Sequence, residues 1–229
     1  MLFRRLLDLI APRPCVICGR RLAPDTEVLC PSCQLHLPRT GFHLSPLDNP
    51  MARLFWGIIP VERVAAYIYY SPGSEVAKMV YDLKYHDRPD IGEALGRMMA
   101  TELLPSGFFD GIDRLVPLPL APKRERQRGY NQSRQLAIGI SEKTALPVSD
   151  DLVCRTAFSG SQTQLSRRDR QDNVANVFQL RDDADLSGCH VLLIDDIVTT
   201  GATVVACARE LLQVDGVRIS VLSFGLTRN

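Results

Sequence analysis

The chain has 229 residues, of which 45% are hydrophobic and 23% are charged, and its formal net charge is +1 at pH 7. These values are ordinary for a folded globular protein and exclude the disordered, fibrous and membrane classes. The length suffices for one full α/β domain and a small accessory domain, and the balanced charge indicates no particular class of partner.

The first twelve residues, MLFRRLLDLIAP, mix apolar side chains with Arg4, Arg5 and Asp8. No apolar core of the usual length and no small-residue cleavage site follows, so the sequence predicts no signal peptide. No apolar run in the chain is long enough to span a bilayer. We therefore expect a cytoplasmic protein whose cysteines are reduced.

Four of the seven cysteines form two Cys-x-x-Cys pairs, CVIC and CPSC, separated by eleven residues. This spacing is typical of tetrahedral zinc, because each short pair aims two thiolates at one ion. Four thiolates leave no position for water, so the expected ion is structural, and its binding would supply about 10–16 kcal/mol towards folding. The alternatives are two disulfides or four unrelated thiols. The predicted zinc ligands are Cys15, Cys18, Cys30 and Cys33.

The next part of the chain predicts a linker, a strand and two helices. Residues 45–60 contain proline and lack periodicity, which is typical of a linker. Residues 63–70 are rich in β-forming side chains, and a helix is expected after them, with Ser71 as its cap and Pro72 at its first position. A second helix is expected over residues 91–104 because its apolar residues recur at helical spacing.

From residue 113 onward, apolar strands alternate with amphipathic helices. This alternation predicts a mostly parallel sheet with helices on both sides. A polar stretch, residues 159–173, interrupts the pattern, and Cys207 in the last helix is expected to be a buried core thiol. The expected strands lie within 113–120, 146–156, 177–180, 189–195 and 217–226, and the expected helices at 131–144 and 202–213.

The stretch VLLIDDIVTTGAT, residues 191–203, carries the most specific chemistry. Ligands of open parallel sheets bind at the carboxyl ends of strands, which is where we expect Asp195 and Asp196. The residues after them lead into a helix N-terminus, whose free N–H groups and dipole favour a phosphate. Carboxylates accept hydrogen bonds from hydroxyls or lie near a metal, so a sugar phosphate suits both halves. An acidic turn at a strand end is the alternative.

The whole stretch resembles the phosphoribosyl pyrophosphate (PRPP) signature of type I phosphoribosyltransferases. The resemblance implies that Asp195 and Asp196 bind the ribose hydroxyls, that the turn holds the 5′-phosphate, and that Mg²⁺ and cations bind the diphosphate. The basic run 123–134 supplies such cations, although a solvated face is the competing interpretation. The PRPP ligands expected besides the acid pair are Thr199, Thr200, Gly201, Ala202, Thr203, Lys123, Arg124, Arg128 and Arg170.

Over its whole length the chain resembles the ComF family of competence proteins, also called the GntX family. The four-cysteine ribbon is followed by RQRGYNQ, by SQTQLSRRDRQDNV and by the PRPP signature. Tyr130 stands where the family motif has phenylalanine. The resemblance implies an α/β type I phosphoribosyltransferase fold with a small N-terminal zinc ribbon. We expect the ribbon in residues 1–45 and the phosphoribosyltransferase domain in 46–229, divided into a hood or linker region (46–110) and a core (111–229).

The first functional hypothesis is an enzyme, a phosphoribosyltransferase whose acceptor the sequence does not identify. The acid pair would position the ribose and stabilise an oxocarbenium-like transition state, while Arg128 and its neighbours would neutralise the leaving diphosphate. Residues 159–173 would form a lid that excludes water, with a disordered surface loop as the alternative. The candidates for contact with the acceptor base are Tyr81, Lys84 and Tyr85.

The second hypothesis is a catalytically silent scaffold that keeps the fold and binds single-stranded DNA or proteins. Arginines flank the cysteine pairs and Tyr130 lies in the basic run, but aromatic residues make up only 7% of the chain, so the signal for base stacking is weak. The family resemblance implies a role in DNA uptake and natural transformation, with a helicase and a recombination mediator as partners. The two hypotheses are compatible, because sugar-phosphate binding could regulate partner binding.

Overall fold

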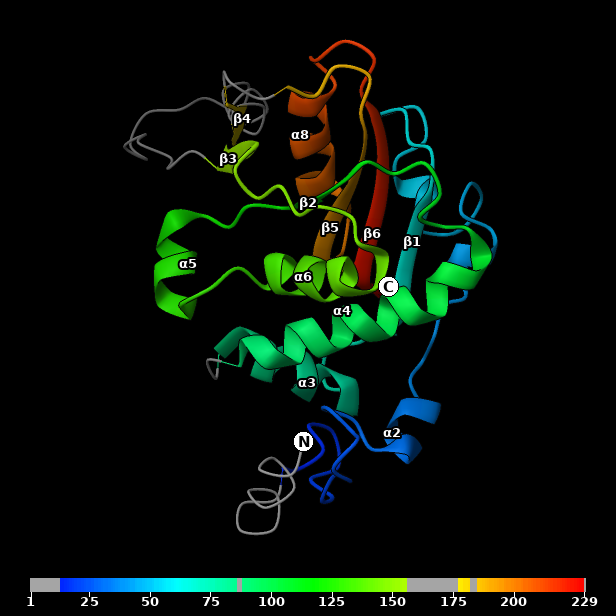
Figure 1. Ribbon diagram of the computed structural model, residues 1–229, viewed down its shortest axis with the longest axis vertical. Coiled ribbons are helices and arrows are strands. Elements are labelled where there is room, and N and C mark those ends of the chain that lie inside the picture. The colour runs from blue at the N-terminus through cyan, green and yellow to red at the C-terminus, as the bar shows by residue number, and fades with distance from the viewer. Residues whose placement is uncertain (1–12, 86–87, 156–176, 182–184, 229) are drawn as a thin grey trace.

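The computed structural model describes residues 13–85, 88–155, 177–181 and 185–228 (Figure 1). Its centre is a parallel sheet of four strands in the order β1-β6-β5-β2, and two short antiparallel strands, β3 and β4, form a second sheet. The strands are β1 (Val64–Tyr70), β2 (Arg114–Pro117), β3 (Val153–Arg155), β4 (Phe178–Leu180), β5 (His190–Val198) and β6 (Arg218–Thr227).

Helices flank the main sheet, so the predicted α/β class is confirmed. Helix α6 packs against β2 and β5, α4 packs against α6, and α8 lies beside β5 and the small sheet. In Figure 1 the carboxyl end of β6 points towards α6 and α4, beyond which lies the segment that carries the four paired cysteines, residues 15–33, here called the cysteine segment. The helices are α2 (Pro31–Leu35), α3 (Glu75–Tyr85), α4 (Pro89–Leu103), α5 (Pro122–Arg128), α6 (Gln132–Thr144) and α8 (Ala202–Leu211), with 3-10 turns η1 (Phe42–Leu44), η2 (Ala52–Leu54) and η3 (Leu104–Ser106).

The two central strands, β5 and β6, form the core of the molecule. Val191 to Ile194 are each 0% exposed, as are Val221 and Leu222 on the neighbouring strand. Such continuous apolar runs are typical of parallel strands that are covered on both faces. Cys207 on α8 is also fully buried, as the sequence predicted. Within the ranges described above, no helix has the length and apolar character needed to cross a membrane.

Residues 45–60 pack as part of the core, so the prediction of a linker is wrong. Met51 and Phe55 are 0% exposed. The Asn49 side chain donates to the carbonyl of Val64 at 2.8 Å and accepts from the N–H groups of Met51 and Ala52, each at 3.0 Å. One buried amide therefore joins this segment to β1, and the short 3-10 turn η2 within the segment is too brief to give a periodic pattern. Strand β1, which falls in the same expected region 46–110, pairs with β6 in the main sheet.

Helix α3 begins later than predicted, at Glu75 instead of next to Ser71. Gly73 adopts a left-handed φ of +84°, which a helix cannot continue through. The Ser74 hydroxyl accepts from the N–H of Ala77 at 3.3 Å and takes the capping role that the sequence assigned to Ser71. The two serines are equally plausible caps by composition, and the glycine turn decides between them.

Helices α4 and α6 touch backbone to backbone through glycines. A Cβ placed on Gly139 of α6 would overlap the carbonyl of Glu93 on α4, and one placed on Gly96 would overlap the carbonyl of Leu136. A side chain at either position would therefore push the helices apart. This contact fixes α4 against the helix that follows the basic run.

The glycine contact leads to a prediction for Gly139→Ala. Overlap with backbone should lower the free energy of unfolding by about 1–3 kcal/mol. Helix propensity alone predicts the opposite sign, a gain of roughly 1 kcal/mol. Urea denaturation decides between the two, with Lys143→Ala at an exposed position of α6 as the control. An unchanged or higher stability for Gly139→Ala would contradict the close contact.

Candidate functional site

A cavity of about 210 Å³ opens at the carboxyl end of β2, next to β5. Its walls combine two carboxylates, four cationic side chains and a proline-containing loop. The lining residues are Lys84, Leu118, Pro119, Leu120, Arg124, Arg128, Gln132, Ser133, Arg155, Asp195, Asp196, Ile197 and Thr203. Residues from α3, α5, α6, β3 and β5 thus meet at one place.

The cavity exists because β2 is shorter than its neighbours. The last residue pair between β2 and β5 is Pro117 with Ile194, whereas β5 stays paired with β6 as far as Val198. Asp195 and Asp196 therefore lie within β5, which continues to Val198, whereas the sequence predicted them at the end of a strand over 189–195. They have a neighbouring strand on one side only, and the other side is open to the cavity.

Asp195 is held in an environment that disfavours its charge. Its Oδ1 accepts from the backbone N–H of Asp196 at 2.8 Å and lies 3.4 Å from the Ser133 hydroxyl, which donates to it. Burial and the adjacent Asp196 carboxylate raise its pKa well above the ordinary value, and the more distant Lys84 opposes the shift only in part. Groups that donate hydrogen bonds to this carboxylate would favour its ionised form.

Lys84 forms an ion pair with Asp196, with Nζ 2.8 Å from Oδ2 and both side chains largely buried. The sequence suggested Lys84 only for contact with an acceptor base, and nothing local connects α3 to β5. A second contact fixes the end of α3, because the Tyr130 hydroxyl donates to the carbonyl of Leu83. The acid pair thus has one cation already in place.

Three arginines line the rest of the cavity: Arg124 and Arg128 from α5, and Arg155 from β3. Arg128 Nη1 donates to Gln132 Oε1 at 2.8 Å. Burial lowers the pKa of Arg155, and the nearby charge of Arg124 lowers it further. Among the residues that the structure describes, no ion pair joins any of these three guanidinium groups to a carboxylate. Their uncompensated charge favours an anion in the cavity.

Arg155 is the lining arginine that sequence reasoning missed. It lies at the end of a three-residue strand, far in sequence from the acid pair, and its guanidinium carbon is 5.3 Å from the centroid of the Phe178 ring. A lone arginine in the segment VCR gives no signal of binding. The only available hint was its position four residues before the polar stretch 159–173 that was expected to be a lid.

The turn between β5 and α8 adjoins the cavity. Gly201, the N-cap of α8, has a φ of +77°, and no side chain caps this helix. A Cβ on Gly201 would lie 2.9 Å from Phe55 Cε1, so both the backbone and the packing require glycine. Thr203 lines the cavity, and Thr199, Thr200 and Ala202 do not, although all four are exposed. The Thr200 hydroxyl accepts from the N–H of Ala202 at 3.5 Å, and the next N–H groups of α8, those of Thr203 and Val204, are available to an anion.

One of the other expected PRPP ligands is not brought to the cavity. Lys123 is exposed on α5 and is not among the lining residues. Arg170, together with the expected lid at 159–173, lies outside the described residues.

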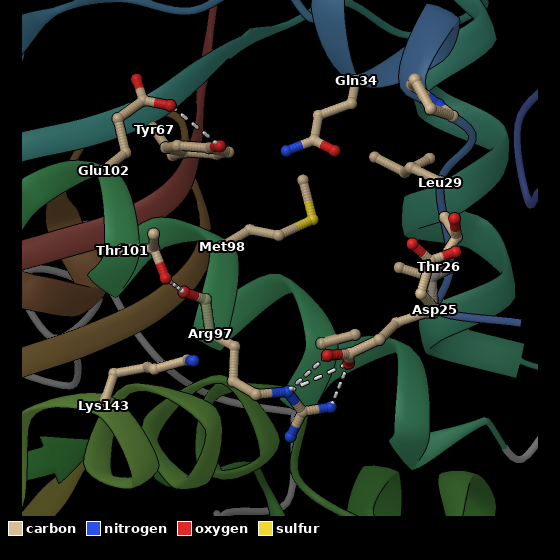
Figure 2. Close-up of a pocket in the computed structure, with 14 residues that line it drawn as sticks. Asp25, Thr26, Leu29, Gln34, Tyr67, Arg97, Met98, Thr101, Glu102 and Lys143 are labelled. Carbon is tan, nitrogen blue, oxygen red and sulfur yellow. Dashed lines mark hydrogen bonds and ion pairs between the residues drawn. The ribbon is translucent and has the colours of Figure 1, made fainter. Parts of the chain in front are cut away.

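A second cavity, of about 530 Å³, lies between the cysteine segment and α4 (Figure 2). Arg97 of α4 donates from Nε to Glu27 Oε2 at 3.0 Å and from Nη1 to Glu142 Oε2 of α6 at 2.7 Å. At the other end of the cavity, the Tyr67 hydroxyl donates to Glu102 Oε2 at 3.1 Å, and burial raises the pKa of Tyr67 to about 12. Arg97 therefore ties the cysteine segment to both helices.

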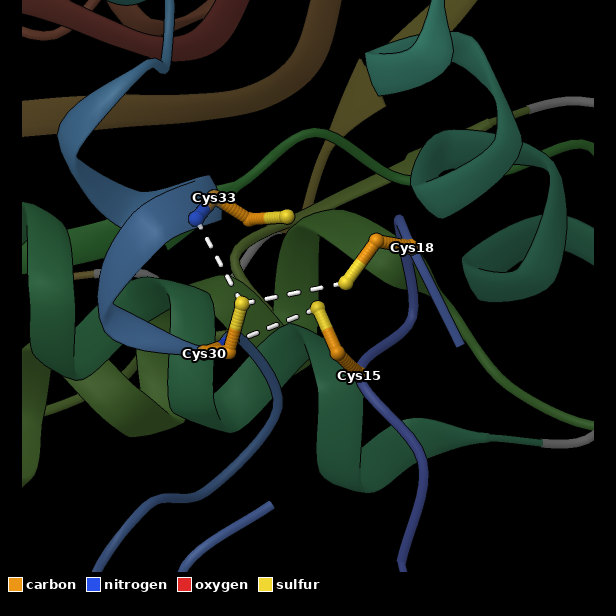
Figure 3. Close-up of side chains that lie close together, drawn as sticks. All are labelled: Cys15, Cys18, Cys30 and Cys33. Atoms are coloured by element: carbon orange, nitrogen blue, oxygen red, sulfur yellow. Dashed lines mark hydrogen bonds between the residues drawn. The ribbon is translucent and has the colours of Figure 1, made fainter. Parts of the chain in front are cut away.

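The four paired cysteines converge on one point (Figure 3). Their sulfur atoms all lie within 4.8 Å of one another, and the Sγ atoms of Cys18 and Cys30 are 3.7 Å apart. A tetrahedral zinc with Zn–S bonds of about 2.3 Å requires sulfur atoms roughly 3.8 Å apart. All four are free thiols, so neither the disulfide alternative nor that of unrelated thiols holds. The cluster can hold one structural metal ion.

Ionisation within the cluster is uneven. Burial opposes the thiolate of Cys15, but backbone N–H donors of Cys18, Cys30 and Ile17 outweigh it and lower the pKa of Cys15 to about 6. Burial and the hydrogen bonds of the neighbouring sulfurs raise the pKa of Cys33. A bound cation would remove this inequality, because it stabilises every thiolate that coordinates it.

The raised pKa of Asp195 leads to a prediction for Asp195→Asn without ligand. The unfolded carboxyl ionises above about pH 4, whereas the folded one resists, so the wild type loses stability as the pH rises above that value. The neutral amide avoids this loss. The variant should melt at a higher temperature at pH 7, by about 2–4 °C for each kcal/mol gained, and the gain should shrink towards pH 4. Asp151→Asn, at an exposed position, is the control. A lower melting temperature for Asp195→Asn than for the wild type would contradict the unfavourable ionisation of Asp195.

Comparison with known proteins identifies the family. No protein-family model matches the chain. The DNA utilization protein YhgH of Escherichia coli K12 is 33% identical over 202 residues, which cover 87% of this chain and 84% of that protein. Competence protein F of Haemophilus influenzae is 32% identical over 117 residues, covering 51% of this chain and 50% of its own. Competence protein ComFC of Bacillus subtilis is also 32% identical, covering 50% of this chain and 44% of its own.

Solved structures similar to the chain are phosphoribosyltransferases. The glutamine PRPP amidotransferase of B. subtilis matches at a TM-score of 0.40 and 20% identity, over 61% of this chain and 30% of its own. An adenine phosphoribosyltransferase matches at 0.38 and 14% identity, over 59% and 71%. On the extent and identity of the Escherichia coli match, the chain belongs to the ComF family of competence and DNA utilization proteins.

Proposed function

We propose that the chain binds PRPP in the 210 Å³ cavity. One observation carries the proposal: a carboxylate pair lines the same small space as three guanidinium groups that form no ion pair with a carboxylate in the described part of the chain. A ligand that suits it must present hydroxyls to one wall and dense negative charge to another. The cavity is smaller than the roughly 300–1,000 Å³ of drug-sized ligand sites, which favours a compact charged ligand.

The acid pair is the ribose side of this proposal. Two vicinal hydroxyls would donate hydrogen bonds to Asp195 and Asp196 and favour their ionised forms. Because Lys84 already forms an ion pair with Asp196, Asp195 is the carboxylate whose negative charge is less well compensated. Binding the ribose would therefore relieve an unfavourable interaction of the ligand-free protein.

The arginines and the turn are the phosphate side. The uncapped start of α8 would bind the 5′-phosphate, and Arg124, Arg128 and Arg155 would bind the diphosphate. Each charge-assisted hydrogen bond contributes about 1.5–3 kcal/mol. Three of them contribute about 5–9 kcal/mol before the cost of ordering side chains, which is a large part of the gross free energy that binding at a dissociation constant near 1 μM, about −8 kcal/mol, requires.

Two metal ions belong to the proposal. Mg²⁺ would be held by the diphosphate oxygens, and the acid pair offers the oxygen ligands that this ion prefers on the protein side. When bound, it would neutralise part of the diphosphate charge. Zinc would occupy the four-cysteine cluster as a structural ion, because the spacing of the sulfurs matches its bond lengths.

The chemistry that fits this arrangement is phosphoribosyl transfer. The bond between C1 of the ribose and the diphosphate oxygen breaks, and a bond from C1 to a nitrogen of an acceptor base forms. Positive charge develops on the ribose, where the acid pair stabilises it, and negative charge develops on the diphosphate, where the arginines do. Since its relatives are named for DNA utilization and competence, we infer that the reaction or its ligand serves the uptake and use of DNA.

Helix α5 offers a matched pair of variants for this proposal. Both Arg124 and Arg126 are exposed on this helix, but only Arg124 lines the cavity. In calorimetric titrations with PRPP and Mg²⁺, Arg124→Ala should weaken binding by about 10- to 100-fold, the loss of one charge-assisted contact. Arg126→Ala should bind as the wild type does. Equal effects of the two substitutions would show that the arginines attract PRPP only through their general positive charge, and would contradict a direct contact from Arg124.

Zinc removal tests the proposed structural ion. The purified chain should contain one zinc per molecule, measured by atomic emission, and Cys30→Ser should lose it because only three thiolates remain. Its melting temperature should fall, since metal binding supplies folding free energy that so small a segment cannot obtain from its core. Cys154→Ser, outside the cluster, should keep both the zinc and the melting temperature. If the purified wild type contained no metal, and Cys30→Ser melted at the same temperature as the wild type, a structural ion would be excluded.

A further inference from the structure

The second cavity, between the cysteine segment and α4, has an apolar lining that the proposed function does not use. Met98 extends into it from α4 and Leu29 from the cysteine segment, and Val28 and Ala94 complete the apolar lining (Figure 2). None of the residues proposed to bind PRPP or zinc lines this cavity. An apolar surface with a polar rim is typical of a docking site for another segment.

The rim of the second cavity carries charges of both signs. Its charged residues are Asp25, Glu27, Arg97, Glu102 and Lys143. Glu27 pairs with Arg97, and Glu102 pairs with Arg39. In the described part of the chain, no ion pair engages Asp25 or Lys143. A segment that fits this cavity would therefore be apolar on one side and would offer a cation to Asp25 and an anion to Lys143.

Residues 1–12, which lie outside the described residues, have this combination in their sequence. Phe3, Leu6, Leu7 and Ile10 recur at positions i, i+3, i+4 and i+7, the spacing of one face of a helix. The charged residues between them are Arg4, Arg5 and Asp8. The sequence analysis assigned no role to this segment.

The position at which the described chain begins brings this segment close to the cavity. The Arg13 guanidinium donates to the carbonyls of Pro24 at 3.3 Å and Glu27 at 3.4 Å, and Glu27 lines the cavity. The lining residues of α4 extend from Ala94 to Glu102, about 12 Å along the helix axis, whereas twelve helical residues span about 18 Å. The segment is therefore long enough to cover the apolar lining.

We propose that residues 1–12 dock in the second cavity of their own chain, with their apolar face on its apolar lining. One arginine of the segment pairs with Asp25, and Asp8 pairs with Lys143. Docking holds the cysteine segment against α4, in addition to the contacts of Arg97. A segment adapted to an anionic membrane would carry cations throughout its polar face, so the anionic Asp8 favours the cavity over a membrane surface.

The test is amide hydrogen exchange of residues 2–10 in the full chain, followed by mass spectrometry. The reference is the free peptide MLFRRLLDLIAP. Exchange in the chain should be at least about 10-fold slower than in the peptide, which corresponds to a docking equilibrium of about 1.4 kcal/mol.

Two variants of the cavity test the apolar and the charged contacts separately. Met98→Asp places a charge on the apolar lining, and Asp25→Arg reverses the charge on the rim, so each should speed exchange of the segment by about 10-fold. Adding Arg4→Asp and Arg5→Asp to Asp25→Arg should restore slow exchange, which a general loss of stability would not do. The controls are Leu35→Asp and Asp151→Arg, at exposed positions that line neither cavity.

The outcomes distinguish docking within one chain from other roles of the segment. Exchange at the rate of the free peptide, or protection that neither cavity variant changes, overturns the proposal. Protection that appears only with vesicles of phosphatidylglycerol assigns the segment to a membrane surface and also overturns it. Protection that rises with chain concentration places the segment in a second copy and overturns docking within one chain. Melting temperatures confirm that each variant folds, and Asp25→Arg, at an exposed position, keeps the test valid if Met98→Asp does not fold.

Discussion

Asp195 is a carboxylate kept beside a second carboxylate, in a part of β5 that has a neighbouring strand on one side only. Burial and the adjacent charge raise its pKa, so the ligand-free chain holds it at a cost in stability. The longer β6 keeps the backbone of both acids in the sheet, and Lys84 pairs with Asp196 but compensates Asp195 only in part. A ligand that carries both hydroxyl donors and an anionic group would stabilise the ionised form of Asp195 and would also neutralise the arginines of the cavity.

The surrounding fold keeps the groups of this site in fixed positions. Gly201 lets the turn after β5 lie against Phe55, which belongs to a segment held together by the side chain of Asn49. The glycines of α4 and α6 bring these helices into backbone contact, and Arg97 joins both of them to the cysteine segment. A metal ion at the four cysteines would therefore stabilise α4, and α6, which lines the cavity, as well as the cysteine segment itself.

The features of the fold and the site that the sequence predicts are those formed by residues that are contiguous in the chain. The strand before Asp195, the glycine turn after it and the paired cysteines each carry a local pattern with a physical cause. Lys84 and Arg155 carry none, because only the folded chain brings α3 and β3 to the end of β5. Residues 45–60 were predicted wrongly for a related reason, since the segment is held to β1 by the side chain of Asn49 and its 3-10 turn is too short to give a periodic pattern. The length of β5 depends on its pairing with β6, which no local pattern reveals.

The most direct test of the central claim is a crystal structure of the chain with PRPP and Mg²⁺. The account predicts both ribose hydroxyls within about 2.6–3.2 Å of carboxylate oxygens of Asp195 and Asp196. It also predicts direct contact of Arg124, Arg128 or Arg155 with the diphosphate. PRPP bound at another place, or an acid pair without ligand at saturating PRPP, would contradict the account.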